Sequence, residues 1–362
     1  MHIERITLKN FRNFETAELN PDSRFNVIHG LNGQGKTNLV EAIYWLGTLR
    51  ALRTSRLREL ISWGQKSTSV AANIVHEGLT HQLKVQFSDG SRQAYREEKK
   101  VNSHSYFGTL SVVLFTPEDA GLVRGTPEAR RRFLDRAIFT GRPAHLQDFV
   151  EYKKALDSRN KLLRDEADDK LIELYEEPLA RSGAKIIESR AQYVEKLAPR
   201  FRETFSMIAG ADLDGMLRYR PSIDIKDGDL VTHLSETWYA DRAKDRVRGF
   251  TQRGPHTDDL AFSLLGRSAR NYASQGQQRA MVLASKISEI GLLKTEHNRL
   301  PVLLLDDVSS ELDAERNRRL FEFLDGFEGQ VFITTTDPGF LHINAQKTAW
   351  KVSSGEIDIT ES

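Results

Sequence analysis

The chain has 362 residues, no cysteine and a formal net charge of +1. Its length suggests two compact units, or one large unit with an insertion. The lack of cysteine excludes disulfides, thiol nucleophiles and thiolate metal sites, and the near-neutral charge means that contact with nucleic acid must depend on local basic clusters.

The N-terminal stretch MHIERITLKNF alternates charged and aliphatic residues, unlike a signal peptide. The densest apolar run, LPVLLL at 300–305, is far shorter than the roughly 18 residues that a membrane span needs. We therefore expect a cytoplasmic protein that does not enter a bilayer.

The first 49 residues predict strands at ITL and FNVIH and a helix from Thr37 to about Leu49. Between them GLNGQGKT has the spacing of a phosphate loop, which binds a nucleoside triphosphate. Lys36 would reach the β- and γ-phosphates, and the Thr37 hydroxyl would hold Mg²⁺. A chance glycine turn is the alternative, which the flanking strand and helix disfavour. The predicted nucleotide-binding residues here are Gly30, Leu31, Asn32, Gly33, Gln34, Gly35, Lys36, Thr37 and Asn38.

Residues 68–115 alternate in polarity (VAANIV, HQLKVQF, SVVLF) and predict antiparallel strands beside the nucleotide core. From about 128 to 208 the pattern is helical, with an apolar seam from Ala180 to Ile208 that needs a partner helix. The stretch 145–163 is the natural candidate, and we expect Pro178 and Pro199 to start or kink helices. The predicted domains are 1–127, 128–250 (an inserted helical lobe) and 251–362.

After Arg253 strand and helix patterns alternate: a strand at 260–265, a helix at 275–293, a strand at 301–307, a helix at 314–325 and a last strand at 330–337. This order predicts a mostly parallel sheet. The strand PVLLLDD ends in Asp306 and Asp307, and a carboxylate there is costly unless it meets a cation. Asp306 would hold Mg²⁺ and Asp307 would orient or deprotonate water, although paired aspartates can also simply end a strand.

The segment NYASQGQQRA (271–280) marks a change from loop to helix. Taken alone, it indicates an ordinary helix start, in which Ser274 caps the helix and Gln277 completes a capping box. A helix N-terminus can also bind an anion such as phosphate, but the segment indicates such a site only when it is read together with the other motifs.

Read in order, GLNGQGKT, ASQGQQ, PVLLLDDVSSELD and FITTTD resemble the SMC-like branch of the ATP-binding-cassette ATPases. NFRNFE (10–15), RRRFLD (130–135) and RGPHTDDL (253–260) are similar to the RecF family of bacterial recombination mediators, over essentially the whole chain. The resemblance implies an α/β ATPase head with a mixed sheet and a short antiparallel helical arm. It also implies a head-to-tail homodimer that encloses two ATP molecules with Mg²⁺. The resemblance further implies that the segment Ser274, Gln275, Gly276 and Gln277 contacts the ATP bound by the partner subunit. It also implies that Asp313 couples the two ATP sites, and that Arg12 and Asn13 contact the nucleotide within their own subunit.

The chain departs from transporter-type cassettes at two catalytic positions. Asp307 stands where glutamate is usual, and Thr336 stands where a switch histidine is usual. No convincing glutamine stands at the Q-loop position after FTPED (115–119), so Glu118 or Asp119 would serve there. We therefore expect slow hydrolysis by a weak, DNA-stimulated ATPase that acts as a switch. The resemblance implies duplex DNA near single-strand gaps as ligand, and RecR, RecO and RecA as partners.

Three basic clusters could contact the DNA backbone without reading sequence. Each could instead be a solvated surface whose charges pair within the protein. The DNA-contact hypothesis names Arg50, Arg53 and Arg56 from the first cluster, and Arg130, Arg131 and Arg132 from the second. The first cluster also contains Arg58, and the second also contains Arg136. The third cluster consists of Arg242, Lys244, Arg246, Arg248 and Arg253.

The same motifs allow other functions. One alternative is a cassette subunit that energises a membrane or other partner. The missing switch histidine and the helical insertion argue against it. An SMC-like tether needs longer arms than residues 128–208 supply. A phosphate-loop kinase would have no use for ASQGQQ.

Overall fold

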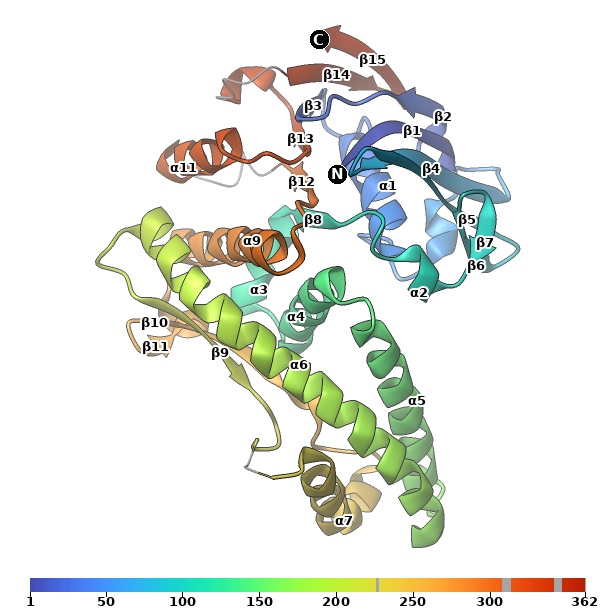
Figure 1. Cartoon of the computed structure of the whole chain (residues 1–362), viewed down its shortest axis with the longest axis vertical. Coiled ribbons are helices and arrows are strands. Elements are labelled where there is room, and N and C mark those ends of the chain that lie inside the picture. The colour runs from blue at the N-terminus through green and yellow to red at the C-terminus, as the bar shows by residue number, and fades with distance from the viewer. Residues whose placement is uncertain (226–227, 308–313, 342–346, 362) are drawn as a thin grey trace. The chain divides into compact units, whose positions relative to one another are not determined.

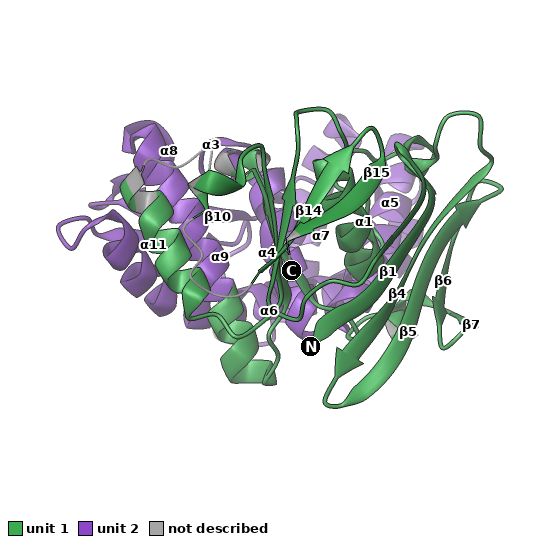
Figure 2. Cartoon of the chain, turned by 90° about the horizontal axis from the view of Figure 1, so that it is seen from above, with its two compact units in different colours: residues 1–120, 290–362 green, residues 121–289 purple. Residues whose placement is uncertain are grey.

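The computed structural model describes residues 1–225, 228–307, 314–341 and 347–361 (Figure 1). The chain divides into two compact units, coloured separately in Figure 2. The first unit combines residues 1–120 with 290–362, and the second comprises residues 121–289. The predicted domain limits at 127 and 250 differ from these bounds, and the three-part division stays a prediction.

An antiparallel sheet of six strands forms one part of the first unit, in the order β2-β1-β4-β5-β6-β7. Apolar residues alternate along these strands, so that one face packs into the core with helix α1 (Lys36–Thr48). The strands are β1 (His2–Phe11), β2 (Phe14–Leu19), β4 (Ser67–His76), β5 (Leu79–Ser88), β6 (Ser91–Arg96) and β7 (Lys99–Val101).

The second sheet of this unit has the order β15-β14-β3-β13-β12-β8 and is parallel except for β15. Because parallel strands end at the same edge, the phosphate loop after β3 and the aspartates at the end of β12 are brought to one edge. The strands are β3 (Phe25–His29), β8 (Val112–Phe115), β12 (Val302–Asp306), β13 (Val331–Thr335), β14 (Lys347–Ser353) and β15 (Glu356–Glu361). Short elements of the unit are α2 (Ser103–Tyr106), η1 (Leu57–Leu60), η2 (Pro117–Ala120) and η4 (Pro338–Phe340), and α11 spans Ala314–Asp325.

Two predictions about this sheet are wrong. SVVLF was expected among the antiparallel strands, but β8 pairs with β12 in parallel. All four β8 residues are buried, the continuous apolar pattern of a strand covered on both faces. The strand at 330–337 is not the last, since β14 and β15 follow it.

Three long helices of the second unit share a hydrophobic core. Helix α5 (His145–Arg164) lies along α6 (Asp169–Ala209) and α6 also contacts α7 (Leu230–Arg248) (Figure 1). The contact of α5 with the seam of α6 confirms the predicted partner helix. Pro178 and Pro199 were predicted to start or kink helices; both lie inside α6, so neither starts a helix, and a kink stays a prediction. Each proline removes one backbone hydrogen bond, and burial of one face holds the helix together.

A small antiparallel sheet, β11-β10-β9, completes this unit. The strand at 260–265 was predicted to join the parallel sheet, which is wrong: β10 pairs with β9, with Leu260 opposite Tyr219. Every second residue of β10 is buried, the pattern of a strand covered on one face. Its elements are β9 (Gly215–Arg220), β10 (Asp259–Leu264), β11 (Arg267–Ser268), α3 (Gly121–Arg124), α4 (Pro127–Gly141), η3 (Pro255–Thr257) and α8 (Ala269–Tyr272), and α9 spans Gln275–His297.

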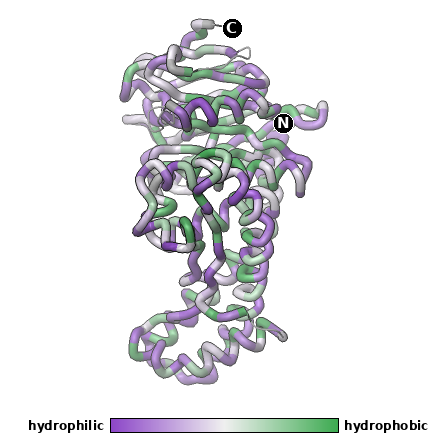
Figure 3. The backbone as a smooth tube through the Cα atoms, turned by 90° about the vertical axis from the view of Figure 1, so that its left-hand side faces the viewer, coloured by the Kyte–Doolittle hydropathy of each residue, from purple (hydrophilic) through white to green (hydrophobic). Residues whose placement is uncertain are grey.

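The hydropathy colouring of Figure 3 shows short apolar stretches interrupted by polar residues along the chain. Within the described ranges, no helix is long and apolar enough to cross a membrane.

Candidate nucleotide-binding site

The phosphate loop depends on glycine at two tightly packed positions. Gly30 and Gly35 have φ angles of 145° and 119°, which other residues rarely adopt. A Cβ atom on Gly30 would lie 2.4 Å from the carbonyl oxygen of Val352, and one on Gly35 would lie 2.5 Å from the Asn13 side chain. The loop therefore packs closely against β14 and against the turn between β1 and β2.

The ammonium group of Lys36 lies inside this loop. Its Nζ donates hydrogen bonds to the carbonyl oxygens of Gly30 (2.7 Å) and Leu31 (3.0 Å). Burial lowers the pKa of Lys36, while the nearby carboxylates of Asp307 and Asp306 act in the opposite direction. A partly desolvated cation surrounded by loop backbone is suited to a phosphate group, whose charge would replace these carbonyl contacts.

Thr37 and Asp306 come together as the sequence predicts. The Thr37 hydroxyl donates to the Asp306 carboxylate at 3.0 Å, and the Thr334 hydroxyl donates to the same oxygen at 2.7 Å. Burial raises the pKa of Asp306, which the two threonine hydroxyls partly offset. Among the residues described, no group of three or more His, Asp or Glu could hold a metal ion. One hydroxyl and one carboxylate fit Mg²⁺, which takes few protein ligands and relies on phosphates and water for the rest.

Asp307 follows β12 in the left-handed region (φ 49°), and its backbone N–H donates to the Thr334 hydroxyl at 2.9 Å. Thr336 directly follows β13 and is exposed. Asp119 accepts a hydrogen bond from the Thr116 backbone N–H at 2.9 Å, within its own turn. The catalytic role of Asp307 and the Q-loop role of Asp119 stay predictions.

The turn between β1 and β2 brings two further predicted residues to the phosphate loop. The side-chain amide of Asn13 donates to the Gln34 carbonyl oxygen at 2.8 Å and accepts from the Asn38 amide at 2.7 Å. The guanidinium of Arg12 donates to both carboxylate oxygens of Glu41, at 2.9 and 3.1 Å. Arg12, Asn13 and Asn38 thus lie together, beside the loop.

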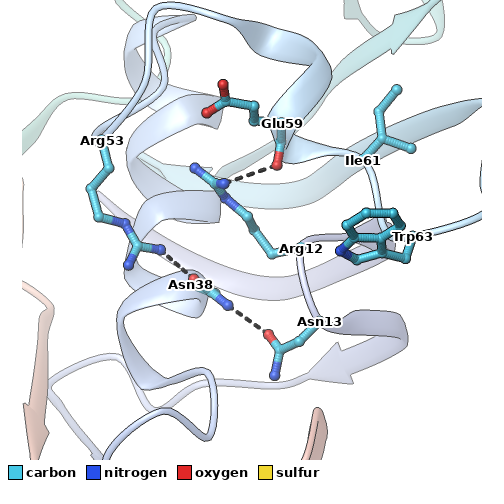
Figure 4. A pocket seen from close by; sticks show the side chains of 7 residues that line it. All are labelled: Arg12, Asn13, Asn38, Arg53, Glu59, Ile61 and Trp63. Atoms are coloured by element: carbon cyan, nitrogen blue, oxygen red, sulfur yellow. Dashed lines mark hydrogen bonds between the residues drawn. The ribbon is translucent and has the colours of Figure 1, made fainter.

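A pocket of about 520 Å³ opens beside these residues (Figure 4). Arg53 was predicted to contact DNA, but its guanidinium donates to Asn38 and, at 3.2 Å, to Glu41. Sequence reasoning missed Glu41, whose signal was a carboxylate inside the apolar helix LVEAIYWL. It also missed Trp63, which gave no signal beyond an aromatic residue in a polar loop. The lining residues are Arg12, Asn13, Asn38, Arg53, Glu59, Ile61 and Trp63.

The ASQGQQ segment, in the second unit, forms the predicted capping box. The Ser274 backbone N–H donates to the Gln277 side chain at 2.8 Å, and the Gln277 N–H donates to the Ser274 hydroxyl at 3.2 Å. Ser274 and Gln275 are exposed, and Gly276 is half-buried. Asp313, predicted to couple two sites, lies outside the described residues. The binding roles of this segment stay predictions.

The sequence profile of the RecF/RecN/SMC N-terminal domain family matches residues 2–358. The chain belongs to this family. The DNA replication and repair protein RecF of Myxococcus xanthus is 43% identical over 370 residues, 99% of this chain and 97% of that protein. RecF of Geobacter sulfurreducens is 41% identical over 363 residues, 99% of each chain.

Solved structures agree with this membership. The recombination mediator protein RecF-ATPrS in the RecFOR pathway has a TM-score of 0.91 and 31% identity, over 99% of this chain and 98% of that one. The Smc head domain of Pyrococcus furiosus has a TM-score of 0.59 at 17% identity, over 99% of this chain and 96% of that one, and shows a likeness of fold alone. This RecF-family chain therefore has the predicted fold: a cassette-type ATPase head, of mixed α/β structure, with a helical lobe.

The basic clusters of this RecF-family chain differ in how their charges are neutralised. Arg130 donates to both carboxylate oxygens of Asp259 (2.6 and 3.0 Å), and Arg132 pairs with Glu128. Arg131 donates to a backbone carbonyl oxygen at 2.6 Å. In the third cluster Arg242, Lys244, Arg246 and Arg253 form ion pairs with nearby carboxylates. Arg50, Arg56 and Arg58 are exposed and form no ion pair within the described part of the chain. Which cluster contacts DNA stays a prediction.

Proposed function

We propose that this RecF-family protein binds ATP with Mg²⁺ and, as an ATP-gated dimer, holds DNA during recombinational repair. The observation that carries the proposal is the phosphate loop, with Lys36 inside it and Thr37 bonded to Asp306. The similarity of the whole chain to RecF proteins, of which solved structures are described as RecF-ATP and RecF-ATPrS, supports the same ligand.

The roles of the site residues follow from their positions. Lys36 would neutralise the β- and γ-phosphate charges. Thr37 and Asp306 would hold Mg²⁺, which supplies charge neutralisation at the transferring phosphoryl group. Asp307 would orient the attacking water, and its short side chain favours slow hydrolysis. A slow step suits a switch, because the lifetime of the closed state then sets how long DNA is held.

The second half of each ATP site would come from another copy of the chain. Ser274 and Gly276 begin α9, whose N-terminal N–H groups attract an anion. We propose that they contact the γ-phosphate of the partner's ATP, as the corresponding segment does in cassette ATPases, with Asp313 between the two sites. A head-to-tail homodimer with two ATP molecules follows from this arrangement.

We propose duplex DNA next to single-strand gaps as the ligand of the closed dimer. The exposed Arg50, Arg56 and Arg58 supply uncompensated positive charge for phosphates. RecO and RecR are proposed partners because similar solved proteins are described as acting in the RecFOR pathway. RecA loading and a cytoplasmic location are proposed from the family resemblance.

Sedimentation of the protein with ATP, with ADP and without nucleotide, each with and without gapped DNA, tests the switch. We expect dimers with ATP and monomers otherwise, and DNA binding only by the dimer. Lys36→Met should abolish both the dimerisation and the DNA binding that ATP induces. If the Lys36→Met protein still dimerised and bound DNA in response to ATP, the proposal would be wrong.

A further inference from the structure

The first turns of α6 carry an apolar stripe that faces water. The exposed fractions of Leu171, Leu174 and Tyr175 are 49, 69 and 40%, and Pro178 is also exposed. Residues three and four positions apart are neighbours on the surface of a helix, so these four side chains form one continuous surface. Apolar side chains that gather in this way on a protein surface mark a place where another molecule binds.

The stripe lies on the side of α6 that the neighbouring helices leave uncovered. Glu176 faces those neighbours, since it is buried and accepts hydrogen bonds from Arg159 of α5 and Arg242 of α7 (Figure 1). Each residue turns a helix by about 100°, so Leu174, two positions earlier, points to the opposite side. Further along this face the exposed residues are polar, as at Gln192. The apolar exposure is therefore confined to the beginning of the helix.

The spacing of the stripe is the same in both directions along the helix: three residues, one residue and three residues separate its members. A second α6 can therefore lie antiparallel to the first, with a two-fold axis midway between residues 174 and 175. Leu171 then meets Pro178 of the partner subunit, and Leu174 meets Tyr175 of the partner subunit. A surface that is complementary to itself is what a contact between two identical copies requires.

The charges beside the stripe favour the same antiparallel arrangement. Lys170 and Glu177 are exposed and lie about two helical turns apart on one edge of the stripe. Lys170 forms no ion pair within the described ranges, and Glu177 pairs with Arg181 of its own helix. Antiparallel pairing brings each Lys170 next to Glu177 of the partner subunit, whereas parallel pairing would bring like charges together. Charge thus selects the arrangement that the apolar spacing allows.

The stripe is too small to hold two copies together by itself. Four side chains cover a few hundred Å² at most, whereas a stable interface takes about 800 Å² from each partner. A contact of this size matters when the two copies are already held close, because their effective concentration is then high. The ATP-bound dimer provides that proximity.

We infer that the stripe is a second contact surface between the two copies of the ATP-bound dimer, formed by antiparallel pairing of their α6 helices around Leu174. The inference rests on the proposed function, because ATP must first bring the two copies together. The surface includes no residue of the nucleotide site. It therefore stabilises the dimer without changing how a single copy binds ATP.

Cysteine crosslinking tests the pairing directly, because the chain has no cysteine of its own. With ATP and a short bismaleimide, Leu174→Cys should form covalent dimers, since residue 174 of each copy lies next to the two-fold axis. Leu171→Cys and Pro178→Cys should each crosslink poorly alone, because antiparallel pairing separates identical residues by about 10 Å along the helix. An equimolar mixture of these two variants should crosslink better than either alone. Without ATP, none should crosslink.

Leu174→Glu tests what the contact contributes, because it places two carboxylates at the two-fold axis. It should raise the protein concentration needed for ATP-induced dimerisation roughly 10- to 100-fold in sedimentation. Gln192→Glu is the matched control, since it adds the same charge to the polar part of the same helix, and it should dimerise as the wild type does. Both variants should keep the circular dichroism of the wild type. Both should also bind ATP with unchanged affinity in equilibrium dialysis of the monomers.

Failure of the inference and failure of the proposed function give different results. Normal dimerisation of Leu174→Glu with ATP, or no crosslinking of Leu174→Cys in a dimer that ATP does form, overturns the inference and leaves the proposed function standing. Crosslinking of Leu171→Cys alone as efficient as that of the mixture shows parallel helices and overturns it too. Crosslinks that join separate ATP dimers into tetramers also overturn it. A wild-type protein that does not dimerise with ATP overturns the proposed function and the inference together.

Discussion

Arginines inside the second unit are buried and paired with carboxylates, whereas several that follow α1 are exposed and unpaired within the described residues. Arg190 is 1% exposed and donates to Asp135 and Asp258, and Arg159 is fully buried between Glu176 and Asp245. Arg56 and Arg58 lie in water, with no ion pair in the described ranges. Burial makes a paired arginine part of the fold, whereas exposure leaves its charge for a ligand.

The buried arginines connect segments that are distant in sequence. Asp258, fully buried, accepts from Arg190 at 3.1 Å, from the Ser222 backbone N–H at 2.8 Å and from the Tyr219 hydroxyl. These contacts join α6, the end of β9 and the RGPHTDDL segment. The RRRFLD and RGPHTDDL segments, which carry much of the family resemblance, therefore include residues that hold the second unit together.

The largest expected effect is that of removing a buried arginine. Arg190→Ala leaves Asp258 and Asp135 without their shared cation, and breaking a buried pair typically costs about 3–5 kcal/mol. Urea unfolding followed by circular dichroism measures the loss. A loss of unfolding free energy below about 1 kcal/mol would show that water or neighbouring groups replace the arginine. Buried and exposed arginines would then not differ in their contribution to stability as we expect.

Glu41 belongs to the first unit but is buried like the carboxylates of the second. Glu41→Gln should destabilise the protein by about 1–3 kcal/mol at neutral pH, because Arg12 and Arg53 lose their charged acceptor. The pKa of Glu41 is lowered from its ordinary value of 4.5, so its stabilisation is present above that pH and is lost as the pH falls through the lower pKa of the folded state. Urea unfolding over a pH series should show wild type and variant converging in acid. A difference that stays constant with pH would contradict the ion pairs.

The exposed arginines should affect DNA binding and leave stability unchanged. Replacing Arg50, Arg56 and Arg58 together by alanine should weaken DNA binding roughly 10- to 100-fold at low salt. The slope of log affinity against log salt should fall by about 0.9 for each phosphate that the variant no longer neutralises. Titration of labelled duplex at several salt concentrations measures both.

The matched control replaces Arg132, Arg181 and Arg318, three exposed arginines that pair with glutamates one helical turn away. This control removes the same charge from surfaces where it is already neutralised. An equal loss of DNA affinity in the two triple variants would mean that total charge, and not the cluster after α1, drives binding.

The smallest effect is expected at Arg132 alone, which the sequence analysis placed among the DNA contacts. Its pair with Glu128 is exposed, and such pairs contribute about 0.3–0.5 kcal/mol. Arg132→Ala should change the unfolding free energy by no more than this and leave DNA affinity unaltered. A several-fold loss of affinity would show that the ion pair opens when DNA binds.

Local patterns predicted much of the fold and part of the site. The glycine spacing of GLNGQGKT, the apolar run before Asp306 and the Ser274–Gln277 capping box each depend on residues close in sequence, and the structure has all three features. Strand pairing was less predictable. SVVLF and LAFSLL each predicted a strand, but which sheet each joins depends on pairing with residues far away in the chain, as when Val112 pairs with Val302.

The phosphate loop, the carboxylate at the end of β12 and the family could all be predicted from the sequence, because each depends on contiguous residues that need no distant partner. The folded chain was needed to show which arginines are neutralised, that Glu41 accepts hydrogen bonds from two of them, and that Trp63 is exposed beside the pocket. The reason is physical: the free energy of a charge or a ring depends on what surrounds it, and the residues that surround it come from distant segments of the chain.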